Sequence, residues 1–234
     1  MSYSSGSLDD SPAVIGRNIR KIFRGGRVDI EPVIDVSIEA YLGELTILRG
    51  PSGGGKTVIM NILAGFVRPD DGKVIILGKD TSKWSWNEWN RFRRDYISYM
   101  PQRSMFISGI KALENILMPI YIRNGDIRSA KVYAIKLAKE LGVDNVLDRK
   151  IYVLSGGEKR RISLIRCLVN PKPIMLLDEP TSNLDREMAD KVIDKILEYK
   201  DPDRALIIAS HDLNLIGRGD TIYEIIDGKS FKVK

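Results

Sequence analysis

The sequence predicts an α/β fold, in which short buried strands alternate with helices and a purely helical lobe is inserted into the sheet. Two observations lead to this prediction. Short apolar runs, several of them bounded by Gly, Pro or Asp, recur along the chain and alternate with segments of helical character. Between Gln102 and Leu154, by contrast, no strand-like run occurs, so we expect this stretch to be helical.

The expected strands are alternating or apolar runs. Residues 32–40, "PVIDVSIEA", alternate apolar and polar side chains, as a strand with one buried face does. Apolar runs that suit buried strands follow at 44–48 ("ELTIL"), 73–77 ("KVIIL"), 95–100 ("DYISYM"), 173–178 ("PIMLLD") and 205–210 ("ALIIAS"). Asp-Gly within "IIDGKSF", residues 225–231, predicts a β-hairpin near the C-terminus.

Helices are expected over residues 56–65, 85–94, 109–120, 126–141, 156–168 and 185–199. The first, fifth and sixth of them each follow directly on a strand or a glycine turn. A chain of 234 residues can bury one sizeable core. We therefore expect one domain over residues 13–234, with the helical lobe at about 103–168 inserted into it.

Composition restricts the class of protein further. With 43% hydrophobic and 29% charged residues the chain is typical of a soluble globular protein, and its net charge of +6 permits a polyanionic partner. Cys167 is the only cysteine, which excludes an internal disulfide framework; we expect it in the core. Residues 1–12 lack the basic and apolar regions of a signal peptide and are expected to form a flexible tail. No apolar run approaches the roughly 20 residues that span a bilayer, so a cytoplasmic location is expected.

The strongest motif is a glycine loop. "GPSGGGKT", residues 50–57, fits the pattern G-x-x-x-x-G-K-[ST], follows an expected strand and opens an apolar helix, which is the context a P-loop requires. Its glycines allow the backbone to direct N–H groups at phosphates. Lys56 would contact the β- and γ-phosphates, and the Thr57 hydroxyl would bind Mg²⁺. A merely flexible glycine turn would not explain Lys and Thr at these positions.

Two carboxylates follow the strand 173–178. Asp178 and Glu179 end "PIMLLDE" and should therefore lie at the carboxyl edge of the sheet, where α/β proteins bind ligands. Alone, such a pair is usually a solvated strand end, but a P-loop needs an aspartate of this kind. We expect Asp178 to hold Mg²⁺ through water, as the Walker B aspartate does, and Glu179 to polarise the attacking water.

A second glycine turn, "LSGGE" at residues 154–158, opens a basic run of helical character, and such a helix entry is itself an anion site. With "LLDEP" (176–180), "SNLD" (182–185) and "SHD" (210–212) it stands in the order seen in ATP-binding cassette (ABC) ATPases. The chain resembles that family from about Arg17 to Phe231. The resemblance implies a P-loop NTPase (RecA-like) core sheet with an antiparallel β arm and an inserted α-helical subdomain.

The resemblance also implies a Mg²⁺-dependent ATPase that binds ATP between two chains packed head to tail. Each P-loop would hold the ATP of its own chain, and the second glycine turn would close over the ATP of the neighbour. Gly54 and Val58 stand where the family more often has Ser and Thr, which leaves the phosphate contacts intact. ATP contacts are expected from Gly50, Ser52, Gly53, Gly54, Gly55, Lys56, Thr57 and Val58 of one chain and from Ser155, Gly156, Gly157 and Glu158 of the other.

Four more positions match the family one at a time. Gln102 in "YMPQ" matches the Q-loop glutamine, which contacts Mg²⁺ and the lytic water, and His211 in "ASHD" matches the switch histidine at the γ-phosphate. A capping or core role is the alternative for His211. Asp185 matches an aspartate that signals across the dimer, and it could equally cap the helix that follows. Phe23 matches the aromatic residue that stacks on adenine, with a core position as its alternative.

Two further features lie outside these motifs. Trp84, Trp86 and Trp89 form either a packing cluster under the β arm or an anchor against a permease or the membrane surface. The basic runs "RFRR" (91–94) and "EKRR" (158–161) are most simply solvated faces.

Residues 104–125 are similar to a segment in the lipoprotein-releasing and macrolide-exporting group, in which a stand-alone ATPase serves separate membrane subunits. In ABC transporters the permease docks in a groove beside the Q-loop. Four apolar side chains are candidates to line that groove, with ordinary packing in the helical lobe as the alternative: Met105, Phe106, Ile107 and Ile110.

The resulting hypothesis is an ATPase subunit that pairs with a second copy of itself or with a paralogous ATPase. It would drive a separate integral-membrane permease from the cytoplasmic face of the membrane, with no direct nucleic-acid contact. The rival is a soluble, non-transport ABC ATPase, such as an assembly factor or a DNA-associated ATPase. DNA-repair and condensing members carry long coiled coils or zinc-binding cysteine pairs between the Walker motifs, and this chain has neither. A P-loop kinase or GTPase would not explain "LSGGE".

Overall fold

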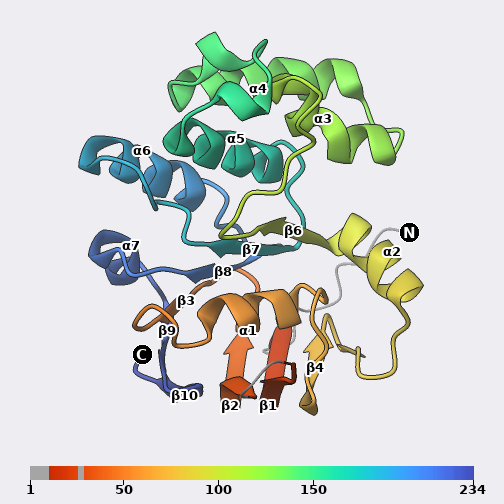
Figure 1. The fold of residues 1–234 in the computed structure, drawn as a ribbon, viewed down its shortest axis with the longest axis vertical. Coiled ribbons are helices and arrows are strands. Elements are labelled where there is room, and N and C mark those ends of the chain that lie inside the picture. The colour runs from red at the N-terminus through yellow and green to blue at the C-terminus, as the bar shows by residue number, and fades with distance from the viewer. Residues whose placement is uncertain (1–10, 26–28) are drawn as a thin grey trace.

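The computed structural model describes residues 11–25 and 29–234. In these residues ten strands form one sheet in the order β5-β4-β1-β2-β10-β9-β3-β8-β7-β6 (Figure 1). Five neighbouring strands at one end of this order run parallel to one another. They are β9 (Thr221–Ile226), β3 (Leu45–Arg49), β8 (Ala205–Ala209), β7 (Ile174–Asp178) and β6 (Ile97–Met100). The predicted α/β fold is therefore confirmed.

The other half of the sheet is the antiparallel β arm. It contains β1 (Val14–Phe23), β2 (Ile30–Ala40), β4 (Asp71–Ile76) and the short β5 (Lys79–Asp80). The predicted hairpin near the C-terminus is present as β9 and β10 (Lys229–Lys232), and β10 connects the arm to the parallel strands. β1 was not expected, because its register shifts and the positive φ of Asn18 interrupt the apolar alternation by which a strand is recognised.

All six expected helices are present, with ends that differ from the predicted ones by at most a few residues. They are α1 (Lys56–Leu63), α2 (Trp86–Tyr96), α3 (Ala112–Ile122), α4 (Ile127–Glu140), α5 (Gly156–Leu168) and α6 (Arg186–Leu197). A further short helix, α7 (Leu213–Gly217), was not expected, since five residues are too few to show a helical period. Among the described helices, none has the length and apolar character required to cross a bilayer.

Two apolar cores cover the two faces of the parallel strands. Leu176 of β7 and Ile207 of β8 face α1, whose Ile59 lies in the same core. Their chain neighbours Leu177 and Ile208 face the opposite way, into the core that holds α5 and α6. The alternation along β7 and β8 thus places α1 and α5 on opposite faces of the sheet.

Helices α3, α4 and α5 lie together on the side of β6 and β7 that faces away from α1 (Figure 1). They come from the stretch in which no strand was expected, and the described backbone there contains helices and turns with one isolated β-bridge. The division into a domain at 13–234 and a lobe at about 103–168 stays a prediction. Residues 1–10 of the predicted tail lie outside the described residues.

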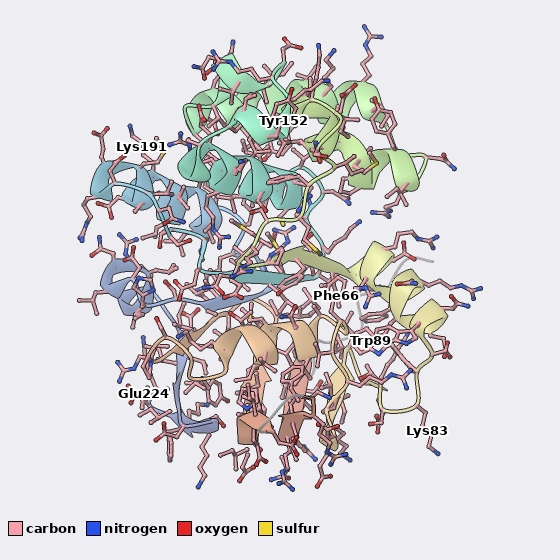
Figure 2. The ribbon with its side chains drawn as sticks, viewed as in Figure 1. Phe66, Lys83, Trp89, Tyr152, Lys191 and Glu224 are labelled. Atoms are coloured by element: carbon pink, nitrogen blue, oxygen red, sulfur yellow. The ribbon has the colours of Figure 1, made fainter. Side chains whose placement is uncertain are left out.

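The tryptophans divide into two environments. Trp84 packs edge-on against Trp89 and Phe92, with ring centroids 5.1 and 4.9 Å away, and Trp89 (Figure 2) is 4% exposed. These two tryptophans form the packing cluster that was one of the alternatives. Trp86 is 51% exposed and lies under the guanidinium of Arg68. Cys167 is buried as predicted, and its burial raises the pKa of the thiol to about 11.

Candidate nucleotide site

The glycine loop joins β3 to α1 and depends on two glycines for its path. Gly50 and Gly55 have φ of 146° and 98°. A Cβ at Gly50 would lie 2.1 Å from the Ile225 carbonyl oxygen, and one at Gly55 would lie 2.2 Å from that of Pro32. Only glycine fits both the conformation and the space, so the loop is held close against the sheet.

The amino end of α1 is suited to bind an anion. Within the described residues no side chain caps this end, and its first turn contains no acidic residue, so the free N–H groups remain available. Lys56 is 7% exposed, and its ammonium donates to the carbonyl oxygens of Gly50 (2.7 Å) and Pro51 (2.9 Å). The positive charge is thereby kept on the loop, as expected for a group that contacts phosphate.

The predicted metal ligands lie beside the loop. Asp178, at the end of β7, is 0% exposed, and among the described residues neither of its carboxylate oxygens has a hydrogen-bond partner. Burial raises the pKa of Asp178, and the Thr57 hydroxyl lies beside its carboxylate. That hydroxyl donates to the Gln102 amide oxygen, 3.3 Å away. A buried carboxylate without a partner, next to hydroxyl and amide oxygens, fits a hard cation such as Mg²⁺.

Glu179 and His211 come from the ends of adjacent parallel strands. The Glu179 backbone has φ of 54°, in the left-handed region, and its N–H donates to the Ala209 carbonyl at 2.8 Å. Its carboxylate Oε2 lies 2.8 Å from His211 Nδ1. The His211 side chain is 72% exposed, which excludes a core position for it. The strand ends therefore bring the predicted base and the predicted switch histidine together.

The second glycine turn is an N-cap in the structure. Ser155 Oγ accepts from the Glu158 N–H (3.2 Å), and the Glu158 carboxylate accepts from the Ser155 N–H (2.7 Å), which is a capping box. The Ser155 N–H, and after it the Ser155 hydroxyl, lower the pKa of the Glu158 carboxyl. The spacing Ser-x-x-Glu could have predicted this arrangement. Ser155 and Gly156 are exposed, and Gly157 lies against the Asn183 carbonyl.

Asp185 and Phe23 are the remaining predicted positions. Asp185 caps α6 by accepting from the Met188 N–H at 2.9 Å, as its structural alternative required. Phe23 ends β1 and is 42% exposed, so it is not a core residue; the Lys21 ammonium lies 5.5 Å from its ring centroid. An exposed aromatic ring remains available to a planar ligand.

The expectation that the run "EKRR" is a solvated face is wrong for Arg160. This residue is 3% exposed, and its guanidinium donates to backbone carbonyls of the Q-loop and of the strand end after β7. Basic runs are usually exposed, but not every residue in them is. The carbonyl groups that bind Arg160 come from distant parts of the chain, so the local sequence does not predict its burial.

Comparisons with known proteins identify the family of the chain. The model of the family described as "ABC transporter" matches residues 33–182. A lipoprotein-releasing system ATP-binding protein, LolD, of Novosphingobium aromaticivorans is 33% identical over 218 residues, which cover 93% of this chain and 97% of that protein. A macrolide export ATP-binding/permease protein, MacB, of a Shewanella species is 32% identical, over 89% of this chain but only 32% of its own length.

Solved structures give the same result. The dimeric ATP-binding cassette MJ0796, bound to ADP and Pi in a post-hydrolysis state, is 28% identical, with a TM-score of 0.85 over 94% of this chain and 99% of that one. These cassettes have the P-loop NTPase fold, and the family binds and hydrolyses ATP, dimerises and powers transporters. This chain belongs to the ATP-binding cassette (ABC) transporter family of ATPases.

Proposed function

We propose that two copies of this chain, or this chain and a paralogue, pack head to tail around two ATP molecules and drive a separate membrane permease. The main support for this proposal is that the two glycine turns lie on opposite faces of the sheet. The P-loop lies at α1, whereas "LSGGE" opens α5 on the opposite face of the sheet. One ATP contacting both turns is therefore more readily bound between two chains than within one.

The P-loop side would perform the chemistry. The loop N–H groups and Lys56 bind the phosphates, and Thr57, Asp178 and Gln102 would hold Mg²⁺. Mg²⁺, when bound, would neutralise charge on the phosphates. Glu179 accepts a proton from the water that attacks the γ-phosphorus, and His211, 2.8 Å from its carboxylate, keeps that carboxylate in place. Ser155 and its glycines, with Asp185, come from the second chain, and the dimeric cassette MJ0796 supports this assembly.

Phe23 is proposed to stack on adenine. Replacing it with Ala should weaken ATP binding by roughly 1–3 kcal/mol, the effect of losing one aromatic stacking platform. The fold should be unaffected, because the ring is 42% exposed. A thermal-shift assay should show an unchanged melting temperature without nucleotide and a smaller ATP-induced increase. A lower melting temperature with undiminished ATP stabilisation would contradict the stacking role.

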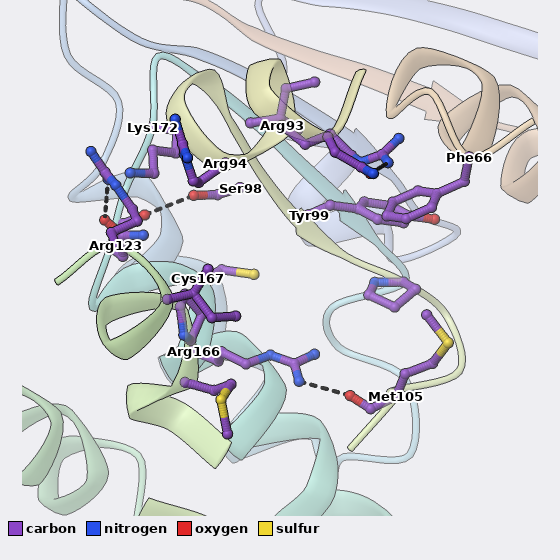
Figure 3. A pocket seen from close by; sticks show the side chains of 17 residues that line it. Phe66, Arg93, Arg94, Ser98, Tyr99, Met105, Arg123, Arg166, Cys167 and Lys172 are labelled. Atoms are coloured by element: carbon purple, nitrogen blue, oxygen red, sulfur yellow. Dashed lines mark hydrogen bonds between the residues drawn. The ribbon is translucent and has the colours of Figure 1, made fainter. Parts of the chain in front are cut away.

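The permease is proposed to dock beside the Q-loop. A pocket of about 410 Å³ lies there between α2, α3 and α5 (Figure 3). Of the 17 described residues that line it, none is acidic and five are basic: Arg93, Arg94, Arg123, Arg166 and Lys172. Asp95 pairs with Arg94 (3.0 Å) and Arg123 (3.9 Å), whereas Arg93 and Arg166 donate to uncharged oxygens, such as the Met105 carbonyl 2.7 Å from Arg166. The combination fits a permease segment that carries carboxylates among apolar residues.

Met105 is the side chain through which this docking can be tested. Of the four apolar candidates for the groove, it lines the pocket and is 68% exposed, whereas Phe106 packs under the Arg166 guanidinium. A photo-reactive amino acid at Met105 should cross-link to an integral membrane protein in membranes of the native cell. The matched control is Val132 on α4, also 68% exposed, which should not cross-link to it. A product at Met105 with a soluble protein instead would favour the non-transport alternative.

A further inference from the structure

Arg160 is a buried cation that no part of the proposed ATP site accounts for. It lies on the second turn of α5 and is 3% exposed. Burial lowers the pKa of its guanidinium, while Asp178 and Glu179 oppose this change by their charge. A buried charge is costly unless it is fully hydrogen-bonded, so its partners indicate what it is there to do.

Within the part of the chain that the structure describes, all hydrogen-bond partners of the guanidinium are backbone carbonyls, and they belong to two segments. One segment follows β6: Nη1 donates to Pro101 (3.0 Å) and Gln102 (2.8 Å). The other ends β7: Nε donates to Glu179 at 2.9 Å, and Nη2 donates to Asp178 and Glu179. The five bonds use the full fork of donors that only arginine offers.

Both segments carry groups of the proposed reaction. Gln102 contacts Thr57, and Glu179 holds a left-handed φ of 54° that a residue with a side chain rarely adopts. Such a conformation persists when its surroundings hold it in place. Two donors on the Glu179 carbonyl, together with the N–H of that residue on Ala209, hold the peptide on both sides.

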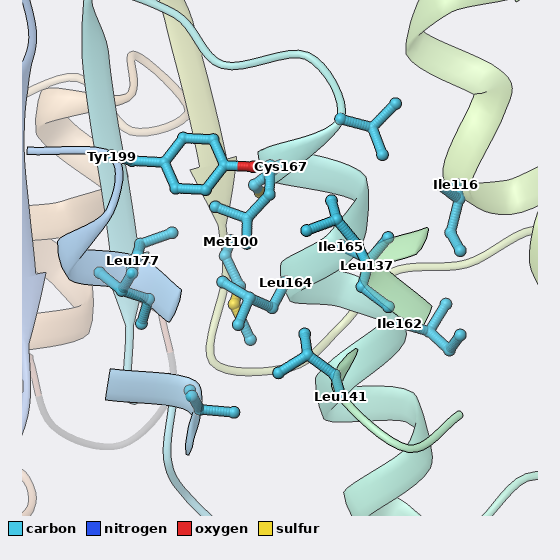
Figure 4. Close-up of a cluster of buried hydrophobic side chains, with 14 of the residues drawn as sticks. Met100, Ile116, Leu137, Leu141, Ile162, Leu164, Ile165, Cys167, Leu177 and Tyr199 are labelled. Atoms are coloured by element: carbon cyan, nitrogen blue, oxygen red, sulfur yellow. The ribbon is translucent and has the colours of Figure 1, made fainter. Parts of the chain in front are cut away.

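The helix that presents Arg160 is itself fixed in the core. Ile162, Leu164 and Ile165, which follow Arg160 on α5, are at most 1% exposed and belong to the same buried cluster as Met100 and Leu177, the residues next to the two segments (Figure 4). The amino end of the same helix is the "LSGGE" turn. One guanidinium thus connects the helix that carries this turn to the backbone of Glu179.

We propose that Arg160 is a positioning residue for ATP hydrolysis, which fixes the Glu179 and Gln102 backbones together and links them to the helix of the "LSGGE" turn. This inference rests on the proposed function, because it assumes that Glu179 is the base. In a head-to-tail dimer, α5 of each chain closes over the ATP bound by the P-loop of the other chain, while Glu179 acts on the ATP bound by its own chain. Arg160 would therefore couple the two ATP sites. Among the described residues, the hydrogen bonds of Arg160 go to Pro101, Gln102, Asp178 and Glu179 and none goes to the P-loop, so we expect Arg160 to matter for turnover far more than for ATP binding.

The test compares the full chain with Arg160→Met and Arg160→Lys. Methionine fills much of the volume without donating, whereas lysine keeps the charge and part of the donor set. We expect kcat to fall about tenfold or more in Arg160→Met and by less in Arg160→Lys, with KM and the Kd for ATP within about threefold of the native values. Arg128→Met, which removes an exposed arginine of α4, should change neither kcat nor KM.

Each result of this comparison supports or contradicts the positioning role of Arg160. Unchanged kcat in folded Arg160→Met overturns the proposal, and so does a loss of ATP affinity and melting temperature that parallels the loss of kcat. If Arg160→Met does not fold, Arg160→Lys is judged by the same split between kcat and KM, and failure of both to fold would make Arg160 structural only. Glu179→Gln, measured alongside, separates the two hypotheses. Normal turnover in that variant contradicts the proposed function, whereas its inactivity with normal Arg160 variants contradicts only this inference.

Discussion

Glu179→Gln should bind ATP and almost cease to hydrolyse it. The Gln side chain has the shape of the Glu179 side chain and can keep its contact with His211, whose Nδ1 lies 2.8 Å from Glu179 Oε2 in the native chain. The amide cannot, however, accept a proton from water. We expect kcat to fall about 10²-fold or more, equivalent to about 2.7 kcal/mol in the barrier. Because the P-loop is untouched, ATP affinity should stay near its native value.

The same variant should reveal the dimer. With hydrolysis blocked, ATP stays between the subunits, and size-exclusion chromatography with light scattering should show a monomer that becomes a dimer when ATP is added. Glu187→Gln is the matched control, since its side chain is 81% exposed on α6 and contacts Lys191. Near-native hydrolysis in Glu179→Gln would show that the base has been assigned to the wrong residue.

Lys56→Ala and Ser155→Arg should each abolish activity alone, yet together should form one working ATP site. Lys56→Ala removes the ammonium group of the P-loop, and Ser155→Arg blocks the second glycine turn with a bulky cation. Each homodimer then has two damaged sites. A hybrid dimer joins the intact P-loop of the Ser155→Arg chain to the intact glycine turn of the Lys56→Ala chain, because an isologous dimer places each turn against the other chain.

Folding has to be verified for Ser155→Arg, because Ser155 caps α5. Losing that cap typically costs about 1 kcal/mol, which a folded domain tolerates. An unchanged far-UV spectrum and a melting temperature within a few degrees of native would show that the variant tests the turn and not the fold. The exposed position of Ser155 leaves room for the larger side chain.

Motifs whose chemistry is local were predictable from the sequence. The P-loop, Asp178, Glu179, Gln102 and His211 each follow a short apolar strand, and the carboxyl ends of parallel strands meet at one edge of a sheet. Their convergence therefore needed only the strand assignments. The contact between Glu179 and His211, from β7 and β8, is the clearest example.

What sequence reasoning missed depends on long-range packing. Arg160 stands in a basic run, and only the folded chain shows that carbonyls 58 and 19 residues away surround it. The cations that line the pocket come from α2, from α5 and from the segments that follow α3 and α5, so no local sequence pattern predicts that they lie together. β1 was not predicted because its bulges interrupt the alternation of apolar and polar residues by which a strand is recognised.

The measurement that tests the two-chain ATP site most directly is a count of trapped nucleotide. Glu179→Gln is added to both Lys56→Ala and Ser155→Arg, the two proteins are mixed at increasing ratios with ATP, and bound nucleotide per dimer is determined after gel filtration. The account predicts almost no ATP at either extreme and a maximum near equal mixing, at roughly 0.5 per dimer if chains pair at random. Trapped ATP that stays flat across all ratios would contradict a site shared between two chains.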